Sequence, residues 1–124
     1  MINKIILQGR MVRDAELRST VEGISVARFV IASERTHAGK DGVREADFIP
    51  CVAFRGLAEH VARYFPKGKM LILEGSLRVQ GYETSEGERR TSYEVLADAV
   101  HFAGGKATKE ETKEEDLFTM DELP

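Results

Sequence analysis

The amino-acid sequence contains one cysteine, Cys51, and no tryptophan. A single cysteine excludes a disulfide framework and any zinc site built from several thiolates, and it fits a reducing compartment. Cys51 lies in the apolar stretch 48–54, where a small buried side chain is expected rather than a nucleophile. The histidines, His37, His60 and His101, lack metal-ligand spacing, and glycine-rich phosphate-binding loops are absent. We therefore expect no enzyme, no bound metal and no cofactor.

Long hydrophobic runs are also missing. No stretch approaches the roughly 20 apolar residues that a membrane-spanning helix requires. The apolar run at the start of the chain is interrupted by Gln8 and Arg10, and no small-residue cleavage site follows it. This pattern does not predict a signal peptide. We expect a cytoplasmic protein without a membrane partner.

The chain as a whole has no excess of basic over acidic residues. Eighteen Lys and Arg against 21 Asp and Glu give a net charge of −3, which speaks against a nucleic-acid binder. The charge is unevenly divided, however. Residues 1–105 hold 15 basic and 14 acidic residues, whereas residues 106–124 hold 3 basic and 7 acidic ones. The body thus carries +1 and the tail −4.

The length of 124 residues fits one domain, which we place at residues 1–105. The tail, residues 106–124, follows a Gly-Gly pair and has too little apolar content to order itself, so it is expected to be a flexible acidic arm. Its end interleaves apolar and acidic side chains, which suits a docking peptide, although composition alone is equally compatible with a solubilising tail. The candidate partner-docking residues are Asp116, Leu117, Phe118, Asp121, Glu122, Leu123 and Pro124.

The body has the pattern of a β protein. Runs rich in β-branched and aromatic residues predict strands at 2–12, 24–32, 45–54, 70–79 and 90–102. Turn signals lie at Glu22-Gly23, at Lys40-Asp41-Gly42 and in the polar stretch 84–88. Gly9 indicates a bulge or a close backbone approach within the first strand.

One helix is predicted, at residues 56–65. Leu57, Val61 and Phe65 recur at intervals of four residues on one face, and Pro66 and Gly68 end the pattern. The resulting order is three strands, one helix and two strands. That order is typical of the OB-fold, a five-stranded Greek-key barrel with a helix between its third and fourth strands.

Aromatic and basic residues interleave along the predicted strands and hairpins. Phe48 and Phe54 share a face if the strand alternates regularly, unless Pro50 introduces a bulge, and Tyr82 lies in the last hairpin. The neighbouring basic residues include Arg28, Arg35, Arg55, Arg78 and Arg90. Taken singly, a strand phenylalanine is more typical of a core, and an arginine of a solvated surface. Their interleaving favours a surface that stacks bases and contacts phosphates.

Five segments resemble the bacterial single-stranded DNA-binding protein family in sequence, order and spacing. They are NKIILQGR at 3–10, DAELR at 14–18, GISVARF at 23–29, EADFIPCVAF at 45–54 and EGSLR at 74–78. The resemblance covers about residues 1–103. It implies an OB-fold homotetramer that wraps single-stranded DNA with little sequence preference. It also implies roles at the nucleoid in DNA replication, recombination and repair.

The resemblance also implies particular site residues. The base-stacking aromatics of the family fall on Phe48, Phe54 and Tyr82. A fourth stacking position falls on His37, which is a departure because imidazole offers a smaller and partly polar face. The basic positions that match the family pattern are Arg10, Arg35, Arg55, Arg78 and Arg90.

Members of this family usually end in acidic residues and a small apolar cluster that closes on phenylalanine and recruits replication and repair proteins. The sequence stops at Leu123-Pro124 without that phenylalanine, so either the chain continues by a residue or the docking peptide is altered. A second hypothesis is an OB-fold adaptor of primosome assembly with secondary nucleic-acid binding. Deleting residues 106–124 separates the two, because a DNA binder would keep its affinity and an adaptor would lose its partners.

Overall fold

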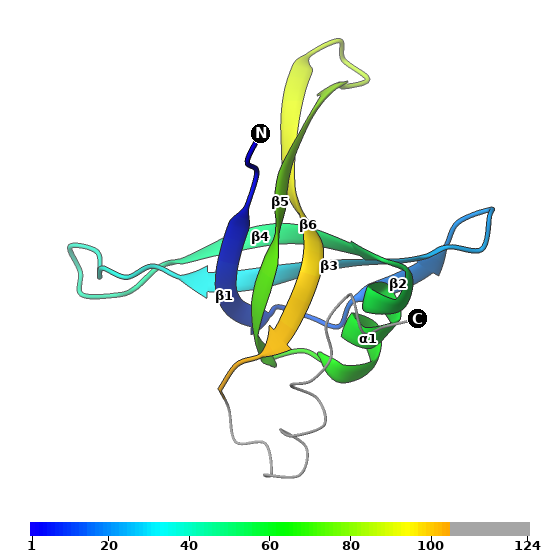
Figure 1. The fold of residues 1–124 in the computed structure, drawn as a ribbon. Coiled ribbons are helices and arrows are strands. Elements are labelled where there is room, and N and C mark those ends of the chain that lie inside the picture. Colours follow the sequence, from blue (N-terminus) through cyan, green and yellow to red (C-terminus); the bar gives the residue numbers. More distant parts are fainter. Residues whose placement is uncertain (105–124) are drawn as a thin grey trace.

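The computed structural model describes residues 1–104, which form six strands and one helix (Figure 1). The elements in chain order are β1 (Ile5–Met11), β2 (Glu16–Ser19), β3 (Ser25–Glu34), β4 (Ala46–Phe54), α1 (Arg55–Tyr64), β5 (Met70–Glu83) and β6 (Arg89–Phe102). Each of the five predicted strands corresponds to one of these, and β2 is additional. The helix begins and ends one residue earlier than predicted and joins β4 to β5, as the predicted order requires.

Five of the strands close into a barrel. The neighbours in the sheet run β1-β5-β6-β4-β3, and an additional pairing of β1 with β3, through Arg10↔Ala32 and Met11↔Ile31, completes the ring. All of these pairings are antiparallel except that of β4 with β6, where Cys51 lies opposite Val95. The expected OB-fold is therefore confirmed as a mainly β barrel with one short helix.

The additional strand β2 continues the path of β1 along β3. Met11 pairs with Ile31 and Glu16 pairs with Arg28, so the four residues 12–15 lie opposite only two residues of β3. This irregularity places the Asp14 carboxylate where it accepts a hydrogen bond from the backbone N–H of Lys67, at 2.8 Å. The predicted first strand corresponds to β1 alone, and the turn at Glu22-Gly23 joins the additional strand β2 to β3.

The core fills the barrel and is covered by α1. Val61 and Phe65 are fully buried, and the Phe65 ring stacks on Phe102 with 4.3 Å between centroids. Cys51 is buried in the same core, and burial raises the pKa of its thiol to about 12, which keeps it protonated and unreactive at neutral pH. Within residues 1–104 no helix is long and apolar enough to span a membrane.

Gly9 allows β1 to approach β3 closely, as its place in the first strand predicted. A Cβ atom at this position would lie 2.7 Å from the backbone oxygen of Ala32, which is closer than such contacts occur. Any side chain here would push apart the two strands that close the barrel.

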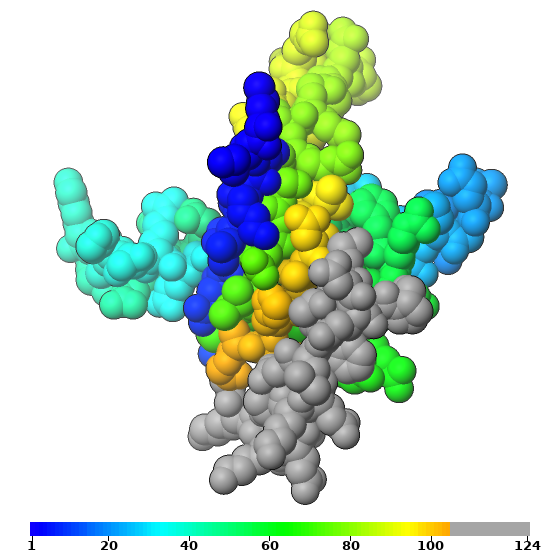
Figure 2. Space-filling model, in the orientation of Figure 1, coloured from blue at the N-terminus to red at the C-terminus, as the bar shows by residue number. Residues whose placement is uncertain are grey.

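Two hairpins extend from the barrel as arms (Figures 1 and 2). We call residues 33–47 the β3–β4 arm and residues 77–95 the β5–β6 arm. The first turns at Gly42 and the second at Gly87, both with φ in the left-handed region, at 80° and 86°. Both turns lie within the segments predicted from the turn signals. The strands of the two arms extend beyond the barrel and do not pack on its core, so their side chains are largely exposed.

Candidate functional site

Strand alternation and register show which side chains share the outside of the barrel. Phe48 lies opposite Ala32, and Arg28, four residues from Ala32, lies opposite Val52. Paired residues and alternate residues of one strand point to the same side of a sheet. Phe48, Arg28 and Val52 therefore point to the same side, away from the core cluster that contains Cys51; Phe48 and Arg28 are exposed there, whereas Val52 is fully buried.

The same reasoning extends this surface across β6 and β5. Val52 lies opposite Leu96, and Glu94, two residues from Leu96, lies opposite Arg78. Further along the β5–β6 arm, Tyr82 lies opposite Arg90. We call this surface the exterior face. It gathers seven of the ten predicted DNA-binding residues, namely Arg10, which pairs with Ala32, and Arg28, Phe48, Phe54, Arg78, Tyr82 and Arg90.

The aromatic side chains of the exterior face are accessible. The exposed fraction is 67% for Phe48 and 50% for Tyr82, whereas Phe54 is half-buried at the N-terminus of α1. Leaving large apolar side chains in water is unfavourable, and an exposed aromatic on a sheet is a ready stacking platform. Pro50 does not disturb the alternation, since it pairs with Val30 in continuous register.

Two predicted arginines on or beside this face have no carboxylate partner within residues 1–104. Arg78 lies on β5, and Arg55 directly follows Phe54 at the first position of α1. Arg55 has φ of 60°, in the left-handed region that ordinary side chains avoid. Both guanidinium groups are exposed and can contact an anion without first leaving another partner.

The other predicted arginines already have partners. Nη1 of Arg28 lies 3.1 Å from Oε2 of Glu94, and Nη2 of Arg90 lies 3.1 Å from Oε2 of Glu88. Arg10 donates a hydrogen bond of 3.1 Å to a backbone oxygen at the barrel end. If Arg28 or Arg90 contacts a phosphate, its guanidinium must either bind the phosphate and the carboxylate together or leave the carboxylate.

Arg35 lies on the opposite side of the β3–β4 arm from Phe48. Its guanidinium lies 2.9 Å from Asp47 and 3.1 Å from Glu45, and Asp47 is adjacent to Phe48 in an extended strand. The hydrogen bond between them raises the pKa of Arg35 and lowers the pKa of the Asp47 carboxyl. The structure therefore does not bring Arg35 together with the exterior face.

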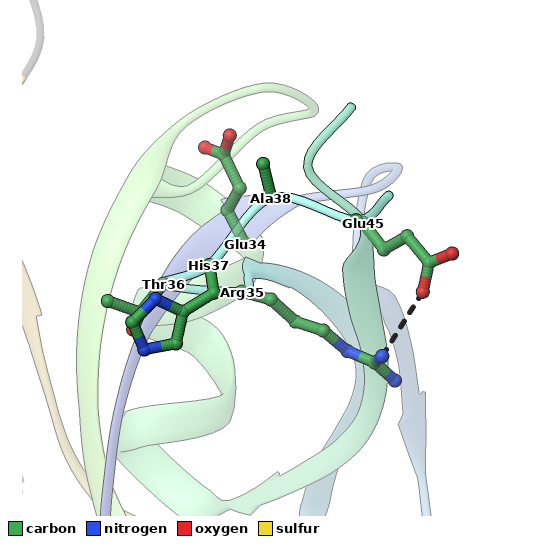
Figure 3. A pocket seen from close by; sticks show the side chains of 7 residues that line it. Glu34, Arg35, Thr36, His37, Ala38 and Glu45 are labelled. Atoms are coloured by element: carbon green, nitrogen blue, oxygen red, sulfur yellow. Dashed lines mark hydrogen bonds and ion pairs between the residues drawn. The ribbon is translucent and has the colours of Figure 1, made fainter. Parts of the chain in front are cut away.

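His37 lies in the turn of the same arm, beside a hollow of about 560 Å³ lined by residues on both sides of the turn. Figure 3 shows its imidazole pointing away from the Arg35 guanidinium, which is turned toward Glu45. Because His37 lies outside the paired strands, register does not assign it to the exterior face. A stacking role for His37 remains a prediction.

Sequence reasoning missed Glu94, an acidic residue of the exterior face. Its position between Arg28 and Arg78 follows from sheet register, which no local sequence pattern indicates. No cluster of three metal-ligating side chains occurs among residues 1–104. The seven predicted partner-docking residues, from Asp116 to Pro124, lie outside the described residues.

Comparisons with known proteins show the family to which the chain is related. Residues 2–103 match the model of the Single-strand binding protein family. Single-stranded DNA-binding protein 1 of Staphylococcus aureus strain MSSA476 is 42% identical over 118 residues, which cover 95% of this chain and 74% of that protein. The Single-stranded DNA-binding proteins of Bacillus cereus and Halalkalibacterium halodurans are 45% and 43% identical over 102 residues, covering 82% of this chain and 60% and 61% of those proteins. The chain belongs to the Single-strand binding protein family.

Proposed function

We propose that this protein binds single-stranded DNA with little sequence preference. Bases stack on Phe48, Phe54 and Tyr82, and phosphates contact Arg55 and Arg78. The observation that carries the proposal is the exterior face, where the exposed aromatics Phe48 and Tyr82 share one side of the sheet with Arg78, which forms no ion pair within residues 1–104. Stacking tolerates any base because every base has a π-face, and it needs neither a metal nor a cofactor.

Fluorescence anisotropy with a labelled oligothymidylate and a duplex of equal length tests the proposal. Tight binding to the single strand and weak binding to the duplex are expected. Tyr82→Ala should weaken single-strand binding by about 1–3 kcal/mol, the value typical of one stacked base. Equal affinity for both nucleic acids would contradict the proposed function.

We further propose that the protein assembles as a homotetramer. Family membership supports this, as do apolar side chains that the single chain leaves exposed away from the exterior face. Val79 and Tyr93 are 55% and 59% exposed on the reverse side of the β5–β6 arm. Light scattering should give the mass of four chains, both alone and with a long oligothymidylate. A monomeric mass at micromolar concentration would contradict this assembly.

The acidic tail is proposed to recruit proteins of DNA replication, recombination and repair to single strands at the nucleoid. Support comes from the sequence, where Phe118 and Leu123 alternate with acidic residues beyond the domain. Deleting residues 106–124 should leave the affinity for oligothymidylate unchanged or higher, because negative charge is removed. It should also abolish retention of replication proteins in a pull-down. A deletion that loses DNA affinity instead would contradict the tail's assignment.

A further inference from the structure

Glu94 places a negative charge in the middle of the exterior face, between two of its arginines. It lies on β6 directly opposite Arg78, and its Oε2 is 3.1 Å from Nη1 of Arg28. Its side chain is only 22% exposed, whereas that of Arg28 is 64% exposed. The carboxylate is thus held beneath the surface while the guanidinium lies above it.

This burial distinguishes Glu94 from the other carboxylate paired with an arginine of the exterior face. Glu88 and Arg90 are 60% and 59% exposed near the end of the β5–β6 arm, where water and salt screen their attraction. Glu94 is shielded from solvent on most sides, so its attraction for Arg28 is screened less. The pair is also fixed from two strands, β3 and β6, on either side of β4.

A guanidinium has five N–H donors, and Arg28 uses one of them on Glu94. The outward donors can reach a phosphate, but the charge that would attract it is offset by the carboxylate below. A phosphate that approaches Arg28 also approaches Glu94, and the two anions repel each other. The cost of that approach depends on the carboxylate charge rather than on its shape.

We propose that Glu94 competes with DNA phosphate for Arg28 and so limits the affinity of the exterior face for single strands. This inference rests on the proposed function. Removing the negative charge of Glu94 releases Arg28 for one additional phosphate contact, which tightens binding and increases its dependence on salt.

Glu94→Gln tests the inference, because glutamine keeps the size and the hydrogen-bond acceptor while removing the charge. Its affinity for oligothymidylate should rise about three- to tenfold, and the slope of log K against log salt should steepen by about 0.7, the value for one phosphate on a single strand. Glu59→Gln is the matched control, since it removes an equal charge from an exposed position on α1 and should change neither quantity.

The double variant Arg28→Gln/Glu94→Gln separates local competition from a general change of charge. If Glu94 acts through Arg28, the gain disappears in the double variant and its affinity returns close to that of the wild type. A gain that persists without Arg28 would overturn the inference, as would an unchanged or weaker affinity of folded Glu94→Gln. Wild-type protein that fails to prefer the single strand would instead refute the proposed function itself.

Thermal unfolding of each variant shows whether it is folded. Should Glu94→Gln not fold, Glu94→Thr, which suits a strand, carries the same expectation of tighter binding. If neither neutral variant folds, the Glu94 carboxylate is needed for folding of the barrel rather than for limiting DNA affinity, and the inference is wrong.

Discussion

At the scale of single residues, the arginines divide by their partners. Arg78 forms no ion pair within residues 1–104, although Glu94 lies opposite it, whereas Arg35 is held by Asp47 and Glu45 on the other side of its arm. An arginine that must leave two carboxylates gains little from a phosphate. The two arginines are therefore expected to differ in their contribution to DNA binding.

Paired neutralisation of Arg78 and Arg35 checks this difference. Arg78→Gln should weaken binding and reduce the magnitude of the salt slope by about 0.7, because one phosphate contact is lost. Arg35→Gln removes the same charge and should leave the slope unchanged. Titrations of oligothymidylate at several salt concentrations measure both, and an equal loss of slope would refute the assignment of the two residues to different faces.

Because of His60, the stability of the folded barrel is expected to fall at acid pH. Its ring is packed against Tyr64, Phe65 and Phe102, with 3% of its surface exposed. Burial lowers the pKa of His60 below its ordinary value of 6.5, because the charged imidazolium is poorly solvated there. The unfolded chain then binds the proton more readily than the folded chain, so stability is retained above pH 6.5 and lost as the pH falls below it.

Urea unfolding at pH 7.5 and pH 5.5 measures this effect. The wild type should lose more free energy of unfolding between the two pH values than His60→Gln, which cannot take up a proton. Carboxylates titrate equally in both proteins, so the difference isolates His60. The same loss in both proteins would show that His60 does not couple folding to protonation.

At the scale of elements, the junction of β4 and α1 affects both the stability of the fold and the proposed DNA binding. Arg55 adopts φ of 60°, although glycine is the residue that adopts this conformation without strain, and Gly56 follows one position later. Hydrophobic spacing predicted the helix to within one residue at each end. It could not predict the strained conformation, which the turn from strand to helix imposes after Phe54.

Replacing Arg55 tests this junction with opposite effects on two measurements. Arg55→Gly should raise the free energy of unfolding by about 1 kcal/mol, because glycine tolerates the left-handed conformation. Arg55→Ala keeps the strain and should not gain stability. Both variants should weaken binding of oligothymidylate to a similar extent, since both lose the guanidinium. Equal stability of the two variants would argue against strain at this position.

At the scale of the whole molecule, the barrel could be predicted because alternation, turn signals and one amphipathic helix all indicated the same order of elements. The interruption at residues 12–15 could not, since it depends on how β1 and β2 share β3. The sequence also could not predict which side chains share a face of the β3–β4 arm. Phe48 pairs with Ala32 and Asp47 with Ser33, and this one-residue difference puts Arg35 and Phe48 on opposite sides.

The net charge also says something about DNA binding only when the charged residues are located on the structure. The body carries +1, and two arginines of its exterior face are paired with carboxylates, so stacking is expected to contribute more to affinity than counterion release. The central claim is accordingly that bases lie on the aromatic side chains of the exterior face.

A tryptophan reporter tests that claim most directly, because the chain has no tryptophan of its own. Tyr82→Trp puts the reporter on the exterior face, and Tyr93→Trp puts it on the reverse side of the same arm, on the surface proposed for tetramer contacts and at a similar exposure in the single chain. Oligothymidylate should strongly quench the emission of Trp at position 82 through base stacking and leave that at position 93 nearly unchanged, with duplex DNA affecting neither. Equal quenching at both positions, or none at position 82 while the DNA is bound, would contradict the account.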